Sequence, residues 1–255
     1  MEKNINKNEV TLNGHVERIH FGAKNAEKGN TPVLLTVRTV ENFDGGNRFT
    51  HTPVTVFADD AQLAAYKDAE ARLGKEESVT IGLVGSLTSH SQYGTGVIAK
   101  PEDVQMGIKL KSEKKNDVGN RVVLDGTIER VIAKSEGFVK VTVLTEQEDR
   151  KAYLAFNINE KRTPEAFKAI MDNIAEDADG KPVLKEGAKM EISLQGQLHN
   201  NNYNKGEEKR YEMVVDANKA EVKLAQKQEK KAEVKAKAAP KKAPKAKKAA
   251  GPKLG

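Results

Sequence analysis

The sequence predicts an all-β protein that contains two tandem copies of one small barrel, with one helix in each copy, followed by a disordered basic tail. Apolar and polar residues alternate along most expected strands, which is typical of a sheet with one buried face. The segment Val10–Phe21 (V-T-L-N-G-H-V-E-R-I-H-F) returns, altered, as Arg121–Ala133 (R-V-V-L-D-G-T-I-E-R-V-I-A). Gly14 and Gly126 are 112 positions apart, and Gly85 and Gly196 are 111 positions apart, so two pairs of glycines have nearly the same spacing. Landmarks so far apart with matching spacing indicate a duplicated domain.

The first copy is expected to contain strands at 10–21, 33–40, 48–57, 78–87 and 97–106. Gly14 lies inside the first strand and predicts a bend, because glycine weakens a plain strand. The hairpin turn is expected at Asp44-Gly45-Gly46. A helix is expected over 59–73, capped by Asp59 or Asp60 and ended by Gly74.

The second copy repeats this order, with strands expected at 122–133, 138–145, 151–158, 188–198 and 210–222 and a longer helix at 164–175. An insertion at 176–186 lengthens its helical connection. Five strands with a helix between the third and the fourth are the order of the OB-fold, a five-stranded Greek-key barrel. The sequence therefore predicts two tandem OB-fold barrels.

The expected boundaries are a flexible leader at 1–8, a first domain at 9–108, a charged linker at 109–119 and a second domain at 120–224. Residues 225–255 are rich in Lys, Ala and Pro, which cannot form a core, and are expected to be disordered. This tail contains 11 Lys and 2 Glu, whereas the other 224 residues contain 32 basic and 35 acidic residues. The net charge of +6 therefore belongs to the tail, and the body must bind any nucleic acid through local basic patches.

Composition argues against several other functions. The chain has no Cys, which excludes a disulfide framework and thiolate chemistry, and no apolar run approaches the length of a membrane span. The five His residues lack the spacing of metal ligands. The sequence contains neither a phosphate-binding glycine-rich loop nor a nucleophile elbow. We therefore expect no enzyme activity, no metal and no cofactor.

Each half resembles the bacterial and phage single-stranded-DNA-binding protein family. In the first half, the resemblance is carried by N-x-V-x-L-x-G at Asn8–Gly14 and V-x-V-F at Val54–Phe57. In the second half, it is carried by R-V-x-L-x-G at Arg121–Gly126 and by G-Q-L-H-N-N-N-Y at Gly196–Tyr203 followed by Arg210-Tyr211. The usual stacking tryptophans are absent, and the basic tail differs from the acidic partner-recruiting tail of the family.

The resemblance implies that aromatic rings stack on bases at the end of the third strand and after the fourth. These roles map onto Phe57 and Tyr93 in the first half and onto Phe156 and Tyr203 in the second. The alternative is that a strand Phe lies in the core. Phe57 is out of phase with Val54 and Val56, which favours an outward ring. For Phe156 the phase is less clear, because Tyr153 and Ala155 are expected on the inner face.

Further candidates surround the hairpin of the first barrel. Phe43 and Phe49 could bind DNA or could simply pack across the hairpin. Phosphate contacts require Lys or Arg along the binding face, and ordinary surface charge is the alternative for each residue. The candidates are Lys24, Lys28, Arg38 and Arg48 in the first barrel and Lys140, Lys151, Lys205 and Arg210 in the second.

These features predict a protein that coats single-stranded DNA without sequence preference during replication, recombination or repair. OB barrels also serve as protein–protein adaptors, and an RNA-binding regulator is a further alternative, so RNA is a second candidate ligand. By analogy with the family, we expect a homodimer holding four barrels. The same analogy places the protein in the cytoplasm of a bacterial cell or a phage-infected host, with no membrane partner.

Overall fold

The structure is a computed structural model of the 255-residue chain and describes residues 6–43, 46–90, 94–107, 119–147, 150–205 and 208–224. All of these residues belong to one compact unit, Met1–Ala225. Strands dominate this unit, and none of the helices in the described ranges is long and apolar enough to cross a membrane. The predicted all-β class is confirmed. The tail and most of the predicted linker lie outside the described residues.

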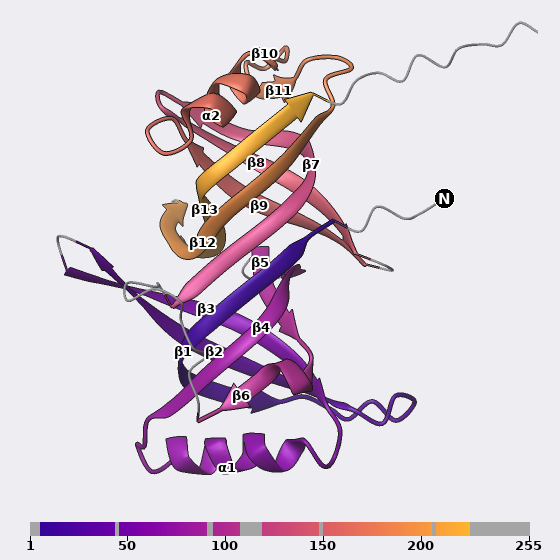
Figure 1. The fold of residues 1–255 in the computed structure, drawn as a ribbon, viewed down its shortest axis with the longest axis vertical. Helices are drawn as coiled ribbons and strands as arrows, with labels where there is room; N and C mark the ends of the chain where they lie inside the picture. The colour runs from indigo at the N-terminus through magenta and orange to yellow at the C-terminus, as the bar shows by residue number, and fades with distance from the viewer. Residues whose placement is uncertain are drawn as a thin grey trace, which may run out of the picture. The chain divides into compact units, whose positions relative to one another are not determined.

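The first barrel consists of β1 (Asn8–Phe21), β2 (Thr31–Phe43), β3 (Gly46–Ala58), β4 (Val79–His90) and β5 (Gly94–Ala99), with α1 (Leu63–Leu73) between β3 and β4 (Figure 1). β1 pairs with β2 and β4, and β3 pairs in parallel with β5, which also pairs with β4. These pairings close the sheet into the predicted OB-fold barrel. A 3-10 turn (Pro101–Asp103) and the short strand β6 (Val104–Met106) follow, so the expected fifth strand at 97–106 is broken at Pro101.

The second barrel consists of β7 (Asn120–Ser135), β8 (Phe138–Gln147), β9 (Arg150–Asn159), β12 (Met190–Lys205) and β13 (Glu208–Leu224), with α2 (Pro164–Met171) after β9. It closes in the same way, including a parallel β9–β13 pairing. The helix expected over 164–175 ends at Met171, because the chain turns into a small hairpin of β10 (Ile174–Glu176) and β11 (Pro182–Leu184). Part of the predicted insertion forms this hairpin.

The first strand of each barrel has a glycine where it passes close to a neighbouring strand, but its register irregularity lies further along, between Val16 and Arg18 in β1 and between Ile128 and Arg130 in β7. β1 pairs with β4 up to Val16 and with β2 from His15 onward, so one strand serves two sides of the barrel. A Cβ atom on Gly14 would collide with the Arg38 carbonyl oxygen, and one on Gly126 would lie 2.5 Å from the Leu144 carbonyl oxygen. The neighbouring backbone leaves no room for a side chain at either position.

The two barrels are joined by antiparallel pairing of β1 with β7, which lie side by side in Figure 1. Val10 pairs with Val122, its own counterpart at an offset of 112. Further contacts are duplicated about this pair, because Asn13 N donates to Gly119 O and Asp125 N donates to Lys7 O, both at 2.7 Å. The barrels therefore meet as a pseudo-symmetric pair within one chain.

Two buried asparagines lie beside this junction. The Asn8 side chain accepts a hydrogen bond from Leu87 N at 2.8 Å and donates to Leu87 O at 2.9 Å. Asn120 makes the matching bonds to Leu198, at 2.7 Å and 3.2 Å, and also donates to Thr39 Oγ1 at 3.1 Å. Each asparagine fixes the start of its first strand to the fourth strand of its own barrel.

Candidate nucleic-acid interface

The outer face of β3 carries two large exposed rings. Val54, Val56 and Ala58 point into the core, whereas Phe49 and Phe57 are 47% and 42% exposed. The structure thus places Phe57 on the outer face, as the alternation predicts. Phe49 also faces outward, and the Arg38 guanidinium lies 5.3 Å from the centre of its ring. A cation over a ring is a favourable electrostatic contact.

Phe156 is a core residue, and the prediction that it faces a ligand is wrong. Its side chain is fully buried, because it alternates with buried Leu154 and Ile158 on the inner face of β9. The face of β9 that was expected to point into the core, with Tyr153 and Ala155, is therefore the outer face. Tyr153 instead points outward and is 53% exposed. The apolar residues at 154, 156 and 158 carry the sequence signal that identifies this phase.

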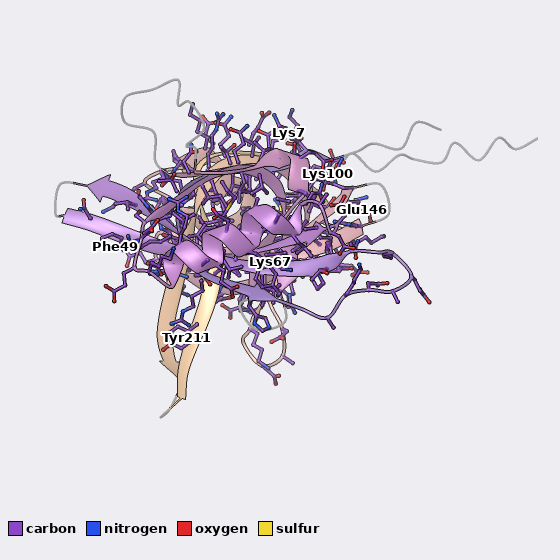
Figure 2. The ribbon with its side chains drawn as sticks, turned by 90° about the horizontal axis from the view of Figure 1, so that it is seen from below. Lys7, Phe49, Lys67, Lys100, Glu146 and Tyr211 are labelled. Carbon is purple, nitrogen blue, oxygen red and sulfur yellow. The ribbon has the colours of Figure 1, made fainter. Side chains whose placement is uncertain are left out.

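Tyr203 is expected after the fourth strand, but the structure extends this strand, β12, through Tyr203, which pairs with Arg210 of β13. β12 and β13 form a long hairpin that carries Tyr211, which is 55% exposed and which sequence reasoning did not place in the site. Figure 2 shows Tyr211 and Phe49 on separate projecting hairpins. The side chains of Phe43, Tyr203, Lys205 and Arg210, and all of Tyr93, lie outside the described residues.

Most of the described candidate cations contact a carboxylate. Lys24 pairs with Asp60 at 2.6 Å, and Arg38 Nε lies 3.2 Å from Glu17 without the alignment of a hydrogen bond. Lys151 pairs with Glu146 at 2.6 Å, and the hydrogen bond to this carboxylate raises the pKa of Lys151. Exposed pairs of this kind contribute about 0–1 kcal/mol, so a phosphate group can replace the carboxylate at little cost.

Lys140 and Lys28 differ from this pattern. Lys140 pairs with Glu212 at 2.6 Å, and its side chain is only 12% exposed, which limits its access to a phosphate group. Lys28 is exposed in the turn before β2 and has no ion pair among the described residues. The structure therefore leaves Lys28 accessible and makes Lys140 a weaker candidate than its sequence position predicts.

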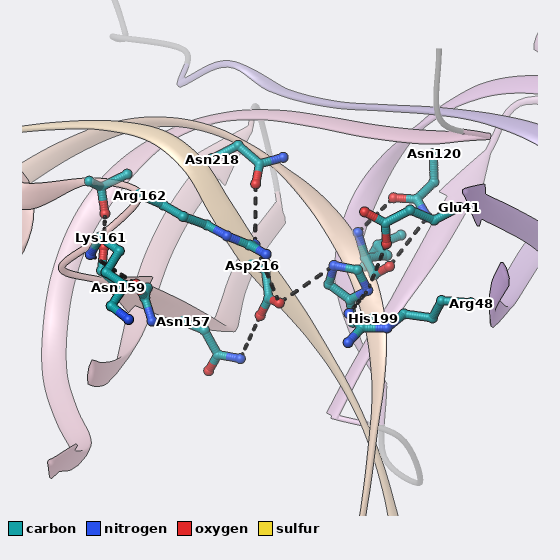
Figure 3. Close-up of polar contacts among 12 residues, drawn as sticks. Glu41, Arg48, Asn120, Asn157, Asn159, Lys161, Arg162, His199, Asp216 and Asn218 are labelled. Atoms are coloured by element: carbon teal, nitrogen blue, oxygen red, sulfur yellow. Dashed lines mark hydrogen bonds and ion pairs between the residues drawn. The ribbon is translucent and has the colours of Figure 1, made fainter. Parts of the chain in front are cut away.

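Arg48 belongs to a polar cluster between the barrels, shown in Figure 3. Its guanidinium lies 3.1 Å from Nδ1 of the buried His199, and the other ring nitrogen of His199 lies 3.5 Å from Asp216. Glu41 approaches Nδ1 at 3.8 Å. Burial lowers the pKa of His199, although Asp216 and Glu41 oppose this effect. A neutral ring accepts from Arg48 at Nδ1 and carries its proton on Nε2, toward Asp216.

Two further aromatic residues lie in the core. Tyr66 of α1 and Phe167 of α2 are both buried, and burial raises the pKa of Tyr66 to about 12. Within the described ranges, no group of His, Asp and Glu side chains could hold a metal ion. The exposed rings and cations of the outer face can stack, donate hydrogen bonds and form ion pairs.

Comparison with solved structures finds the same architecture in a DNA-binding protein. A deletion mutant of the single-stranded DNA binding protein from Thermus aquaticus matches with a TM-score of 0.51 at 16% identity, covering 88% of this chain and 97% of that chain. The wild-type protein matches with a TM-score of 0.49 at 14% identity, covering 96% and 98%. No family model and no curated protein matches the sequence. At the level of fold, the resemblance noted in the sequence is confirmed.

Proposed function

We propose that this chain binds single-stranded DNA without sequence preference, by base stacking on exposed rings and by ion pairing with the backbone. The observation that carries the proposal is the outward orientation of Phe49 and Phe57 on β3 and of Tyr153 on the equivalent strand β9. Rings that face solvent from a rigid sheet can stack on any base, because every base has a π-face. The shared fold with the Thermus aquaticus protein supports the same conclusion.

The distribution of charge is compatible with this mode of binding. Arg38 and Lys151 lie on the same outer faces as the rings, and their carboxylate partners are partly exposed. A strand that replaces these carboxylates gains phosphate contacts, and the basic tail adds 11 Lys of sequence-independent attraction. Roles in replication, recombination or repair, a cytoplasmic location and assembly as a homodimer belong to the same proposal.

A fluorescence titration tests the proposal. The chain has five Tyr and no Trp, so the emission comes from tyrosine, and the exposed Tyr153 reports on stacking at β9. Oligo-dT should quench this emission, and an RNA oligonucleotide of matched length should bind more weakly. Binding of duplex DNA as tight as that of oligo-dT would contradict a stacking mechanism, because paired bases do not expose their faces. Preference for the RNA would assign the chain to RNA binding instead.

A further inference from the structure

A groove of about 1040 Å³ lies where the two barrels meet. Phe57, Val84 and Ile98 of the first barrel give it an apolar surface, and the 3-10 turn at Pro101–Asp103 lines it as well. The second barrel contributes Asp125, Gln147 and Arg150. Phe57 and Val84 are 42% and 37% exposed, so the apolar surface is open to a ligand.

Three cations also line the groove, namely Lys7 and Lys100 from the first barrel and Arg150 from the second. Within the described ranges none of them has an ion pair, in contrast to Lys24, Lys140 and Lys151. Figure 2 shows Lys7 and Lys100 close together, on the side away from Tyr211. These cations can contact a phosphate group without first losing a carboxylate.

Four carboxylates lie in the same groove, those of Glu9, Glu102, Asp103 and Asp125. With four acidic side chains and three basic ones, overall charge does not attract a polyanion here. Affinity at this site must therefore come mainly from stacking and apolar contact, with the cations fixing the position of the backbone.

The equivalent face of the second barrel is polar. Ser86 pairs with Ile98 and Gln197 pairs with Asp216, so Asp216 stands where the first barrel has Ile98. By the same register, Asn159 replaces Phe57 and Gln195 replaces Val84. Asp216 accepts a hydrogen bond from Asn157 at 2.7 Å and pairs with Arg162 at 3.9 Å (Figure 3). At the positions equivalent to Phe57, Val84 and Ile98, the second barrel therefore offers neither a ring nor an apolar side chain to a base.

We propose that the two barrels are not equivalent, and that one single strand of DNA passes from the first barrel to the second through this groove. A base stacks on Phe57, while Lys7, Lys100 and Arg150 contact the flanking phosphates. The junction provides one such subsite per chain. This inference rests on the proposed function and adds to it the path of the strand and the contribution of the second barrel.

Paired variants of the full-length chain test the asymmetry. Phe57→Ala should weaken oligo-dT binding on the order of 5- to 140-fold, the effect of one lost stacking contact. Its structural counterpart Asn159→Ala should bind within about twofold of wild type. Arg150→Gln should reduce the salt slope of binding by about 0.7, as expected for one phosphate contact on a single strand. The exposed Lys161→Gln, in the second barrel, should leave the slope unchanged.

A labelling experiment gives a readout that does not depend on affinity. The chain has no Cys, so Ser86→Cys in the groove and Gln197→Cys at the matching position of the second barrel each provide a single thiol. Saturating oligo-dT should slow maleimide labelling at position 86 and leave position 197 unaffected. Equal protection at both positions would overturn the asymmetry. In an alternative outcome, position 86 is protected in the absence of DNA and becomes reactive when residues 225–255 are deleted. That result would show that the tail occupies the groove, and it would also overturn the proposal.

Two outcomes distinguish failure of this inference from failure of the proposed function. If wild type binds oligo-dT but Phe57→Ala and Arg150→Gln bind equally well, the groove is not on the path of the strand and only this inference falls. If folded wild type does not bind oligo-dT at all, the proposed function falls and the inference falls with it.

Discussion

Replacing Asn120 by alanine should destabilise the second barrel and its contact with the first. The Asn120 side chain is buried and makes three hydrogen bonds, two with the backbone of Leu198 and one with Thr39. Alanine would leave the N–H and C=O of the buried Leu198 and the hydroxyl of Thr39 without their partner. An unsatisfied buried polar group costs about 1–3 kcal/mol, and partial access of water reduces the sum. We therefore expect a loss of about 2–5 kcal/mol in the free energy of unfolding.

The pseudo-symmetry of the chain supplies an internal comparison. Asn8→Ala removes the two matching bonds to Leu87, and among the described residues Asn8 has no counterpart of the Thr39 contact. Its cost should be smaller, by about 1 kcal/mol. Urea unfolding followed by far-ultraviolet circular dichroism measures both values, with Asn30→Ala at a half-buried turn as the control. A loss below about 0.5 kcal/mol for Asn120→Ala, or a larger loss for Asn8→Ala, would refute the proposed role of these asparagines.

Three further predictions concern packing, pH and the tail. Gly126→Ala should cost about 1–3 kcal/mol in urea unfolding, because its Cβ would lie 2.5 Å from the Leu144 oxygen, whereas Gly74→Ala, with 3.5 Å to its nearest neighbour, should be nearly neutral. Because burial lowers the pKa of His199 in the folded chain, its contribution to stability is complete above pH 6.5. This contribution is lost as the pH falls below 6.5 toward the pKa in the folded chain. The free energy of unfolding should then decrease by at most about 1.4 kcal/mol per pH unit, and His199→Gln should remove this pH dependence. Deleting residues 225–255 should lower the affinity for oligo-dT and flatten its salt dependence, whereas an unchanged slope would show that the tail does not contact DNA.

The sequence was sufficient to predict the order of strands and helices, because that information is local. Alternation along β1 and β3 and the recurrence of Gly14 at Gly126 reflect requirements that each barrel meets separately. The same alternation predicts that Phe57 points outward, since the inner face of β3 is occupied by Val54 and Val56.

The errors lie where tertiary pairing decides the conformation. Phe156 is an exception, because the alternation of Leu154, Phe156 and Ile158 along β9 already indicates that this face is buried. The segment Asn200–Asn202 shows no apolar alternation in the sequence although it lies in β12 and pairs with β13, so an extended strand resembles a loop there. Likewise, nothing local to His199 or Arg48 indicates that they meet across the barrels. The groove at Phe57 is hidden from sequence for the same reason.

The most direct test of the account is a titration of the full-length protein with poly-dT and with duplex DNA at two salt concentrations, followed by tyrosine fluorescence. The account predicts quenching by poly-dT at both salt concentrations, weaker binding of the duplex, and an affinity that falls as salt increases. A folded protein that does not respond to poly-dT at low salt would contradict it.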